Sequence, residues 1–228
     1  MKATFLTATW RNLALVNYEA PPGLLEAHLP EGCDLDLLDG RPMMSLVAFE
    51  FLDTRVLGVP WPGFRDFPEW NLRFYARRGS ERGVCFVREI VPQAWVCAVA
   101  RGLYGEPYSP APMRVSRRTT RERADRRYEV RWKGRVHRID VRARNAPFLP
   151  AAGSEAAWFK EQQWGFRGGR RYRVVHRPWR VFPVESCSVD VDWAQLYGPE
   201  WGVMQGATPR SVVLAEGSPV RVAWWSGG

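Results

Sequence analysis

The side chains that most often bind metal ions or act as nucleophiles are few in this sequence and lie far apart. The histidines are His28, His137 and His176. None has a second histidine or a cysteine at the spacing of a zinc or iron site. The cysteines are Cys33, Cys85, Cys97 and Cys187. No two of them form a CxxC pair, and three lie in apolar runs that are typical of buried free thiols. We therefore expect a metal-independent protein without a cofactor.

A basic segment at residues 114–144 has the residue types of a nucleic-acid surface. Eleven arginines lie between Arg114 and Arg142, and Tyr128 and Trp132 among them could stack on bases. The acidic residues interspersed with them are Glu122, Asp125, Glu129 and Asp140. Such mixed charge is more typical of a solvated, ion-paired strand face than of a nucleic-acid partner. Nucleic-acid binding through this segment is therefore the alternative function, beside a structural or interaction role.

The length and composition are those of one globular domain. With 228 residues, of which 46% are hydrophobic and 25% are charged, the chain can bury its own core, so we expect a single domain over residues 1–228. No run approaches the ~18 apolar residues that span a bilayer, which indicates a cytoplasmic protein without a membrane partner. The net charge of +9 comes almost wholly from arginine, which either attracts anions or reflects the composition of the source. Homo-oligomerisation stays open.

Short apolar runs separated by turn residues predict an α+β fold that is mostly antiparallel β. Strands are predicted, among others, at LALVNY, MMSLVAFEFL, NLRFYARR and GVCFVREIV. Asp39-Gly40 and Lys133-Gly134 are expected at hairpin turns, since glycine readily adopts the positive φ of a tight turn. Helices are predicted at 21–30, 92–105 and 154–162, the last with Ser154 as N-cap. Many short strands with two or three helices favour an antiparallel sheet that can close on itself.

Three segments of the sequence resemble the acetoacetate decarboxylase superfamily. They are Arg11 with the following LALVNYEAPPGLLEAHLPEG, NLRFY at 71–75, and ARGLYGEPY at 100–108. Residues at matching positions are Arg11, Tyr18 and Pro30 in the first segment, and Arg101, Gly105 and Pro107 in the third. The chain is more closely similar to the YqjF-like branch, a family of unknown function, through FLDTRVLGVP, HRPWRVFPVE and SVVLAEGS as well. This resemblance implies an acetoacetate decarboxylase-like closed or strongly curved sheet with two or three helices.

The resemblance also shows where the chemistry should depart from that of the decarboxylases. In those enzymes a signature lysine with a lowered pKa condenses with a ketone, and the iminium draws electrons from the departing carboxylate. Here Tyr108 falls at the position of that lysine, and Asn71 falls at about the place of a catalytic glutamate. The lysines of this chain are Lys2, Lys133 and Lys160. Since none lies in the three segments and a tyrosine cannot form an imine, the sequence predicts that the covalent route is absent.

What the resemblance leaves is a pocket for a small anionic ligand, expected to be a carboxylate or an oxo acid. The expected ligand-binding residues are Arg11, Arg73, Arg101 and Tyr104, and the expected catalytic residues are Asn71, Glu106 and Tyr108. An arginine fork matches a carboxylate bidentately. A tyrosine near arginines could act as a general acid and Glu106 or Glu89 as a base, for enolisation, hydration or hydrolysis. We expect Arg11, Asn71, Arg101 and Tyr108 to line one cavity.

Each of these residues also has a structural interpretation. Arg73 alternates with apolar neighbours on a predicted strand and could face solvent, whereas Arg101 could be a cation at the C-terminal end of a helix. Tyr104 could be a core aromatic residue, and His176 a strand-end histidine with satisfied hydrogen bonds. A pocket is favoured only if a fold brings these side chains together.

Overall fold

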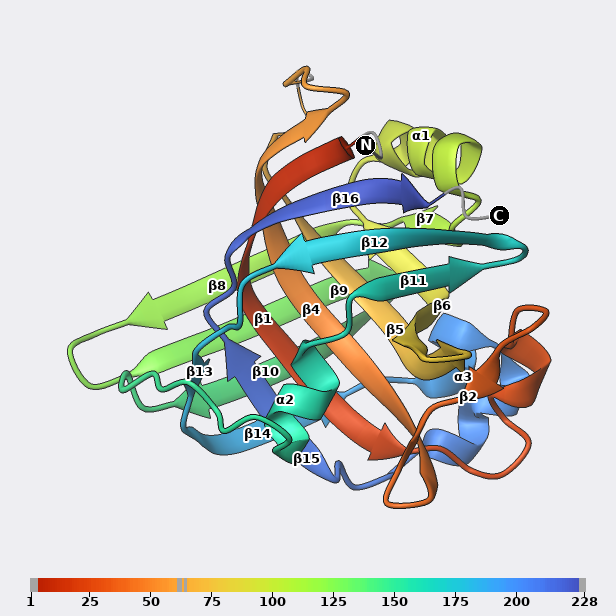
Figure 1. Cartoon of the computed structure of the whole chain (residues 1–228). Coiled ribbons are helices and arrows are strands. Elements are labelled where there is room, and N and C mark those ends of the chain that lie inside the picture. Colours follow the sequence, from red (N-terminus) through yellow and green to blue (C-terminus); the bar gives the residue numbers. More distant parts are fainter. Residues whose placement is uncertain (1–3, 61–62, 64, 226–228) are drawn as a thin grey trace.

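The computed structural model describes residues 4–60, 63 and 65–225, apart from the side chains of Val99, Leu103, Tyr104 and Trp225. Among these residues, seven strands close into a barrel through the pairing of β1 with β4 (Figure 1). In order around the barrel they are β1 (Thr4–Glu19), β16 (Pro219–Trp225), β12 (Arg170–His176), β11 (Trp164–Arg167), β6 (Glu81–Val91), β5 (Phe67–Arg78) and β4 (Arg41–Val56). Neighbouring strands are antiparallel, except that β6 and β11 run parallel.

Strand β5 shows how the sequence builds the barrel wall. Successive side chains of a strand point to opposite faces. The inward residues of β5 are Phe67, Glu69, Asn71, Arg73 and Tyr75, and the outward ones are Trp70, Leu72, Phe74 and Ala76. The outward side chains are fully buried although they lie outside the barrel. A second layer must therefore cover them, and the polar side chains of β5 face the barrel interior.

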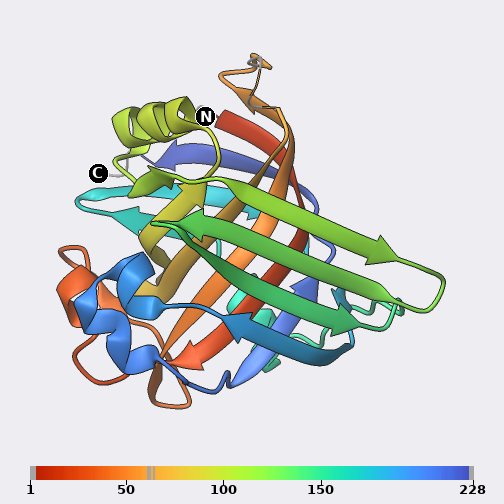
Figure 2. The same ribbon diagram turned by 180° about the vertical axis from the view of Figure 1, so that it is seen from behind.

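The second layer is a four-stranded antiparallel sheet that lies across the outside of the barrel (Figure 2). Its strands are, in order, β14 (Val184–Asp190), β10 (Arg135–Ala143), β9 (Ala124–Trp132) and β8 (Met113–Thr119). Tyr128, Val130 and Ile139 of this sheet share one apolar cluster with the outward residues of β5. Burying a large apolar side chain contributes about 1.5–3 kcal/mol, so this interface supplies a major part of the core.

A polar network fixes the second sheet to the barrel at a bulge in β1. Asn12 adopts a φ of 55°, a left-handed conformation that asparagine tolerates better than most residues. Its Nδ2 donates to Glu50 Oε2 at 2.7 Å, and its Oδ1 accepts from Arg126 Nε of β9 at 2.8 Å. The hydroxyl of Tyr128 donates to the Asn12 carbonyl oxygen. The bulge thus satisfies polar groups that would otherwise be buried between the two layers.

Short elements flank the two sheets. The helices and 3-10 turns are α1 (Ala94–Tyr104), α2 (Glu155–Lys160), α3 (Trp193–Tyr197), η1 (Glu26–His28) and η2 (Pro199–Met204). The short strands are β2 (Asp34–Leu35), β3 (Leu37–Leu38), β7 (Tyr108–Pro110), β13 (Val181–Phe182) and β15 (Ser211–Ala215). In Figure 1, α1 lies near the start of β1 and the end of β16. No helix in the described part of the chain is both long and apolar enough to cross a membrane.

The predicted fold class is confirmed, and one predicted helix is wrong. Both predicted turns form with positive φ, Asp39-Gly40 between β3 and β4 and Lys133-Gly134 between β9 and β10. Segment 21–30 is not an amphipathic helix but contains only the 3-10 turn η1. The predicted helix would begin at Pro21, but Gly23 adopts a φ of +82°. This left-handed conformation interrupts a right-handed helix after two residues. Pro30, which has no backbone N–H to continue a helix, ends the segment.

Candidate functional site

The barrel interior contains a cavity. The centre of a water-sized sphere can occupy about 90 Å³ of it. One water molecule needs about 10–15 Å³ by this measure, so the cavity has room for a few waters or a small organic molecule. Much of its wall is aromatic, with Trp10, Phe49, Phe51, Phe86, Trp164 and Trp179 as lining residues. An apolar pocket with a few convergent polar side chains is the usual form of a small-molecule site.

Three buried glutamates line this cavity, and we call them the acidic cluster. Glu69 comes from β5, Glu89 from β6, and Glu106 from the loop between α1 and β7. Their exposed fractions are 2%, 3% and 3%. Strand pairing brings Glu89 opposite Asn71 of β5 and opposite Tyr108 of β7. No group of three metal-binding side chains in the described part of the chain is arranged to hold an ion.

Two tyrosines and one amide satisfy part of the acidic cluster. Glu69 accepts hydrogen bonds from Asn71 Nδ2 at 2.9 Å and from the Tyr108 hydroxyl at 2.8 Å. Glu106 accepts one from the Tyr172 hydroxyl at 3.0 Å. Burial and the nearby carboxylates raise the pKa of both tyrosines well above the ordinary value, so both phenols stay neutral donors.

Three oxygens of the site have no hydrogen-bond partner among the described residues. They are Glu89 Oε2, Glu106 Oε2 and Asn71 Oδ1. A buried polar atom without a partner costs about 1–3 kcal/mol, and more when it is charged. The two carboxyl oxygens can be protonated, and all three atoms can accept hydrogen bonds from water or from a ligand that carries donors.

The pKa values of the acidic cluster are raised, and two of them lie near neutral pH. Burial raises the pKa of Glu69 to about 7, and the hydrogen bonds from Asn71 and Tyr108 partly offset this effect. Burial likewise raises the pKa of Glu106 to about 7. The pKa of Glu89 lies well above its ordinary value, first because of burial and then because Glu106 and Glu69 repel another negative charge. At neutral pH the acidic cluster therefore contains both carboxylic acid and carboxylate, the two forms that acid–base catalysis uses.

Three basic side chains line the same cavity, and we call them the basic cluster: Arg73 of β5, Lys160 of α2 and His176 of β12. Arg73 lies four residues farther along β5 than Glu69, which is about 13 Å along a strand. Its Nη2 donates to the Phe159 carbonyl oxygen at 3.0 Å, whereas its buried Nε has no partner among the described residues. Burial lowers the pKa of His176, which favours the neutral imidazole.

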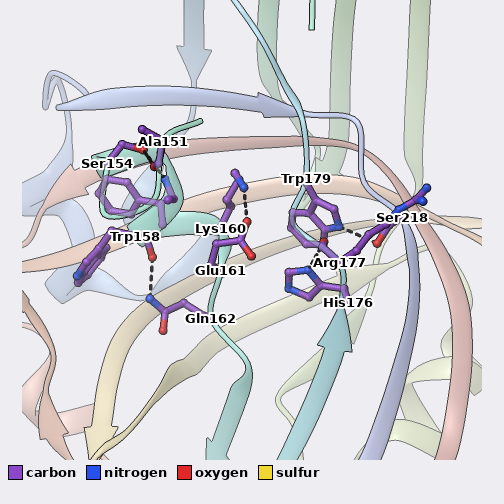
Figure 3. Close-up of polar contacts among 12 residues, drawn as sticks. Ala151, Ser154, Trp158, Lys160, Glu161, Gln162, His176, Arg177, Trp179 and Ser218 are labelled. Carbon is purple, nitrogen blue, oxygen red and sulfur yellow. Dashed lines mark hydrogen bonds and ion pairs between the residues drawn. The ribbon is translucent and has the colours of Figure 1, made fainter. Parts of the chain in front are cut away.

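Lys160 is the last residue of α2, and its side chain is only 1% exposed. The helix begins at Ser154, whose Oγ accepts from the Ala157 amide. Lys160 Nζ donates to the carboxylate of Glu161. Figure 3 shows these two side chains between α2 and the end of β12, where His176 stacks on Trp179 with ring centroids 4.1 Å apart. Lysine is almost never this buried without a partner or a function.

Four of the seven site residues predicted from the sequence lie on the cavity. They are Asn71, Arg73, Glu106 and Tyr108. Glu89, the other base that the sequence suggested, lines it as well. Tyr104 belongs to α1, but its side chain lies outside the described part of the chain.

The expectation that Arg11 and Arg101 share this cavity is wrong. Both residues are exposed, and neither is among the described residues that line the cavity. Trp10 lines the cavity, so Arg11, the next residue of β1, points to the opposite face. Helix α1 buries Val96, Cys97 and Ala100 and leaves Arg101 on its exposed side.

The sequence interpretation missed Glu69, Lys160 and Tyr172. Glu69 carried a usable signal, because it precedes Asn71 by two residues on a strand and must share its face. Tyr172 and Lys160 belong to elements about a hundred residues from β5 along the chain, and only the closure of the barrel brings them to it.

The arginine-rich segment 114–144 forms most of the outer sheet, away from the cavity. Several of its arginines pair with acids of the same sheet, such as Arg138 with Glu129 at 3.0 Å and Arg135 with Asp190 at 2.8 Å. Arg126 is buried and bonds Asn12. The segment thus combines surface ion pairs with an anchor to the barrel.

Comparisons of the sequence find relatives whose function is not characterised. The family model of DUF2071, described as an uncharacterized conserved protein, matches residues 7–219. The uncharacterized protein YqjF of Bacillus subtilis strain 168 is 24% identical over 196 residues, which cover 78% of this chain and 75% of YqjF.

Comparisons of the structure find acetoacetate decarboxylase-like enzymes. One from Sphingomonas wittichii RW1 has a TM-score of 0.65 at 13% identity, over 98% of this chain and 94% of that one. The acetoacetate decarboxylase of Legionella pneumophila has a TM-score of 0.65 at 13% identity, over 97% and 85%. The enduracididine biosynthesis enzyme MppR complexed with pyruvate has a TM-score of 0.64 at 12% identity, over 98% and 89%. At these identities the likeness establishes the fold and leaves the reaction to the site itself.

Proposed function

The chain belongs to the DUF2071 family, and we propose that its barrel cavity binds a small oxo acid and transfers protons at the carbon next to the carbonyl group. The acidic cluster carries this proposal, because buried carboxyl groups with pKa values near 7 line the barrel cavity. Such groups exchange protons readily at neutral pH. Burying them lowers the stability of the fold, which favours a functional role over a structural one.

Arg73 would hold the carboxylate of the ligand. Its side chain lines the cavity, and its Nε has no partner among the described residues. A guanidinium group binds a carboxylate more specifically than an ammonium group does, because its planar fork matches the two oxygens. The backbones of Arg73 and Glu69 are about 13 Å apart along β5, and both side chains extend from the inward face of the strand into the same cavity. A short ligand anchored at the end of the Arg73 side chain would therefore direct its carbon chain toward the acidic cluster.

The acidic cluster would then act on the carbon next to the carbonyl group. An ionised carboxylate accepts a proton from this carbon, and the C–H electron pair moves toward the carbonyl oxygen to form an enol. A protonated carboxyl group or a neutral phenol, such as that of Tyr172, donates to this oxygen as charge develops there. The reverse step returns a proton to carbon, so the cycle consumes no other reactant.

The known ligands of one structural neighbour support an oxo acid as the ligand class. MppR has been solved with pyruvate and with the condensation product of pyruvate and imidazole 4-carboxaldehyde. These ligands belong to MppR, and the likeness to this chain rests on the fold. They indicate that a barrel of this architecture can enclose a three-carbon oxo acid.

Proton exchange into pyruvate in D2O tests the proposal directly. The protein should accelerate the replacement of the methyl protons of pyruvate or 2-oxobutyrate by deuterium, measured by proton NMR. Replacing Glu69 or Glu106 with Gln keeps the side-chain shape but removes the base, and should slow the exchange by about 100-fold.

Glu31→Gln is the matched control, because Glu31 is exposed. It should exchange protons at the wild-type rate. Exchange no faster than in buffer for either oxo acid would overturn the proposal, and so would equal rates in the cavity variants and the control.

A further inference from the structure

We propose that Lys160 is an amine nucleophile of the cavity, and that its Nζ condenses with the carbonyl carbon of the oxo acid to form an imine. The inference rests on the proposed function, because it needs a carbonyl compound in the same cavity. It reverses the expectation from sequence, which excluded an imine because Tyr108 occupies the signature position. Lys160 lines the cavity from α2, an element that the signature does not include.

The burial of Lys160 sets it apart from the other lysine that the structure describes. Lys133 lies exposed in the turn between β9 and β10, whereas the Lys160 side chain is 1% exposed and lines the cavity. Lys2 lies outside the described residues. Burying a lysine costs free energy even when its ammonium group is paired, as Lys160 is with Glu161. Lysine is also the residue that forms Schiff bases with carbonyl substrates.

The backbone that carries Lys160 is held in place from the barrel wall. The carbonyl oxygen of Phe159 accepts from Arg73 Nη2 at 3.0 Å and from the Tyr75 hydroxyl at 3.4 Å. The Phe159 ring packs edge-on against Tyr75 with centroids 5.4 Å apart. Two inward side chains of β5 thus fix the residue before Lys160. The expected carboxylate anchor, Arg73, and the amine are therefore positioned by one shared contact, which suits a ligand whose carboxylate and carbonyl are adjacent.

Glu161 lies where it can remove a proton from the ammonium group of Lys160. It accepts the hydrogen bond from Lys160 Nζ, and its side chain is 31% exposed. A carboxylate with one side in the protein and one in solvent can take a proton from the ammonium group and release it to water. His176, with its lowered pKa, lines the same region as a neutral imidazole.

The condensation balances without any further reactant. After Glu161 removes one proton, the Nζ lone pair forms a bond to the carbonyl carbon, and the carbonyl oxygen takes a proton to give a carbinolamine. The C–O bond then breaks, and the oxygen leaves as water with a second proton. An ammonium group and a ketone thus become a protonated imine and water, with one positive charge on each side. The imine draws electrons more strongly than the ketone does, so it would ease proton removal by the acidic cluster.

Reductive trapping tests the role of Lys160. Wild-type protein is incubated with pyruvate and cyanoborohydride, and the adduct is located by intact mass and peptide mapping. We expect one reduced pyruvate adduct, on the peptide that contains Lys160. Lys160→Arg keeps a cation beside Glu161 but cannot form an imine, and Lys160→Met keeps much of the apolar stem. Both variants should lose the adduct, whereas the control Lys133→Met should keep it.

Deuterium exchange separates failure of this inference from failure of the proposed function. If wild-type protein exchanges the methyl protons of pyruvate but Lys160 carries no adduct, Lys160 is not the nucleophile and the proposed function stands. Adducts of equal yield on Lys133 and Lys160 would show non-specific labelling and also overturn the inference. If pyruvate and 2-oxobutyrate neither exchange nor become trapped, both proposals fail. Thermal unfolding of each variant identifies loss of the fold, and the second substitution at Lys160 then decides.

Discussion

Glu69 and Glu106 link the stability of the protein to pH. In the folded chain each has a pKa of about 7, above the ordinary value of 4.5, so between these values the folded state binds more protons than the unfolded state. Their contribution to stability is therefore full below about pH 4.5 and is lost as the pH rises through about 7. One such shift corresponds to roughly 3 kcal/mol. We expect the free energy of unfolding of Glu106→Gln to fall less than that of wild type between about pH 5 and pH 8.

Urea denaturation at several pH values measures this difference. The lowered pKa values of the histidines act in the opposite direction, but they do so in both proteins and cancel in the comparison. Glu31→Gln, at an exposed position, should follow the wild-type pH dependence. Parallel curves for wild type and Glu106→Gln would mean that the carboxyl groups of the acidic cluster are not desolvated.

The sequence predicted the site residues correctly where strand alternation, or a match to the decarboxylase signature next to them, was enough to place the side chain. Asn71 and Arg73 lie on one face of β5 because they are two residues apart, and Glu106 and Tyr108 follow α1 directly. Arg11 and Arg101 were matched by residue type, but the direction of a side chain depends on strand register and on which helix face is buried. Lys160 had no local signal, because its role depends on a contact between α2 and β5.

At the scale of elements, Gly165 makes room for a tyrosine of the site. Gly165 of β11 pairs with Tyr172 of β12, and a Cβ atom at residue 165 would overlap the Tyr172 ring. The ring must then move, and its hydrogen bond to Glu106 would be lost. We expect Gly165→Ala to destabilise the protein by about 1–3 kcal/mol and to slow proton exchange into pyruvate.

Gly169→Ala is the matched control for this substitution. It lies in the turn between the same two strands, where a Cβ atom would meet no other atom within 4 Å. Urea denaturation and the NMR exchange assay compare the two variants. If Gly165→Ala behaves as the control does, Tyr172 does not need its position over Gly165 to support the site.

The predictable elements were those whose signals are local. The hairpins at Asp39-Gly40 and Lys133-Gly134 follow from residues that tolerate positive φ, and α2 follows from the Ser154 cap. Closure of the barrel depends on pairs far apart in sequence, such as β6 with β11 in parallel. Turn and cap residues say nothing about such pairs, so a closed barrel could be expected only through the family resemblance.

At the scale of the whole molecule, the two layers separate charged groups at the surface from charged groups around the cavity. The outer sheet carries several arginines of segment 114–144 in ion pairs at the surface, whereas the acidic and basic clusters line the barrel cavity among aromatic side chains. The second sheet buries the outward face of β5, and the polar side chains of its inward face line the cavity. A net charge of +9 therefore describes the surface and says little about the site.

A crystal structure of the protein soaked with pyruvate tests the location and chemistry of the site together. We expect density for the ligand inside the barrel, with its carboxylate at Arg73, its methyl carbon toward the acidic cluster, and its carbonyl carbon beside Lys160 or bonded to it. Density only on the arginines of the outer sheet, or a barrel that excludes pyruvate at concentrations that support exchange in solution, would contradict a site in the cavity.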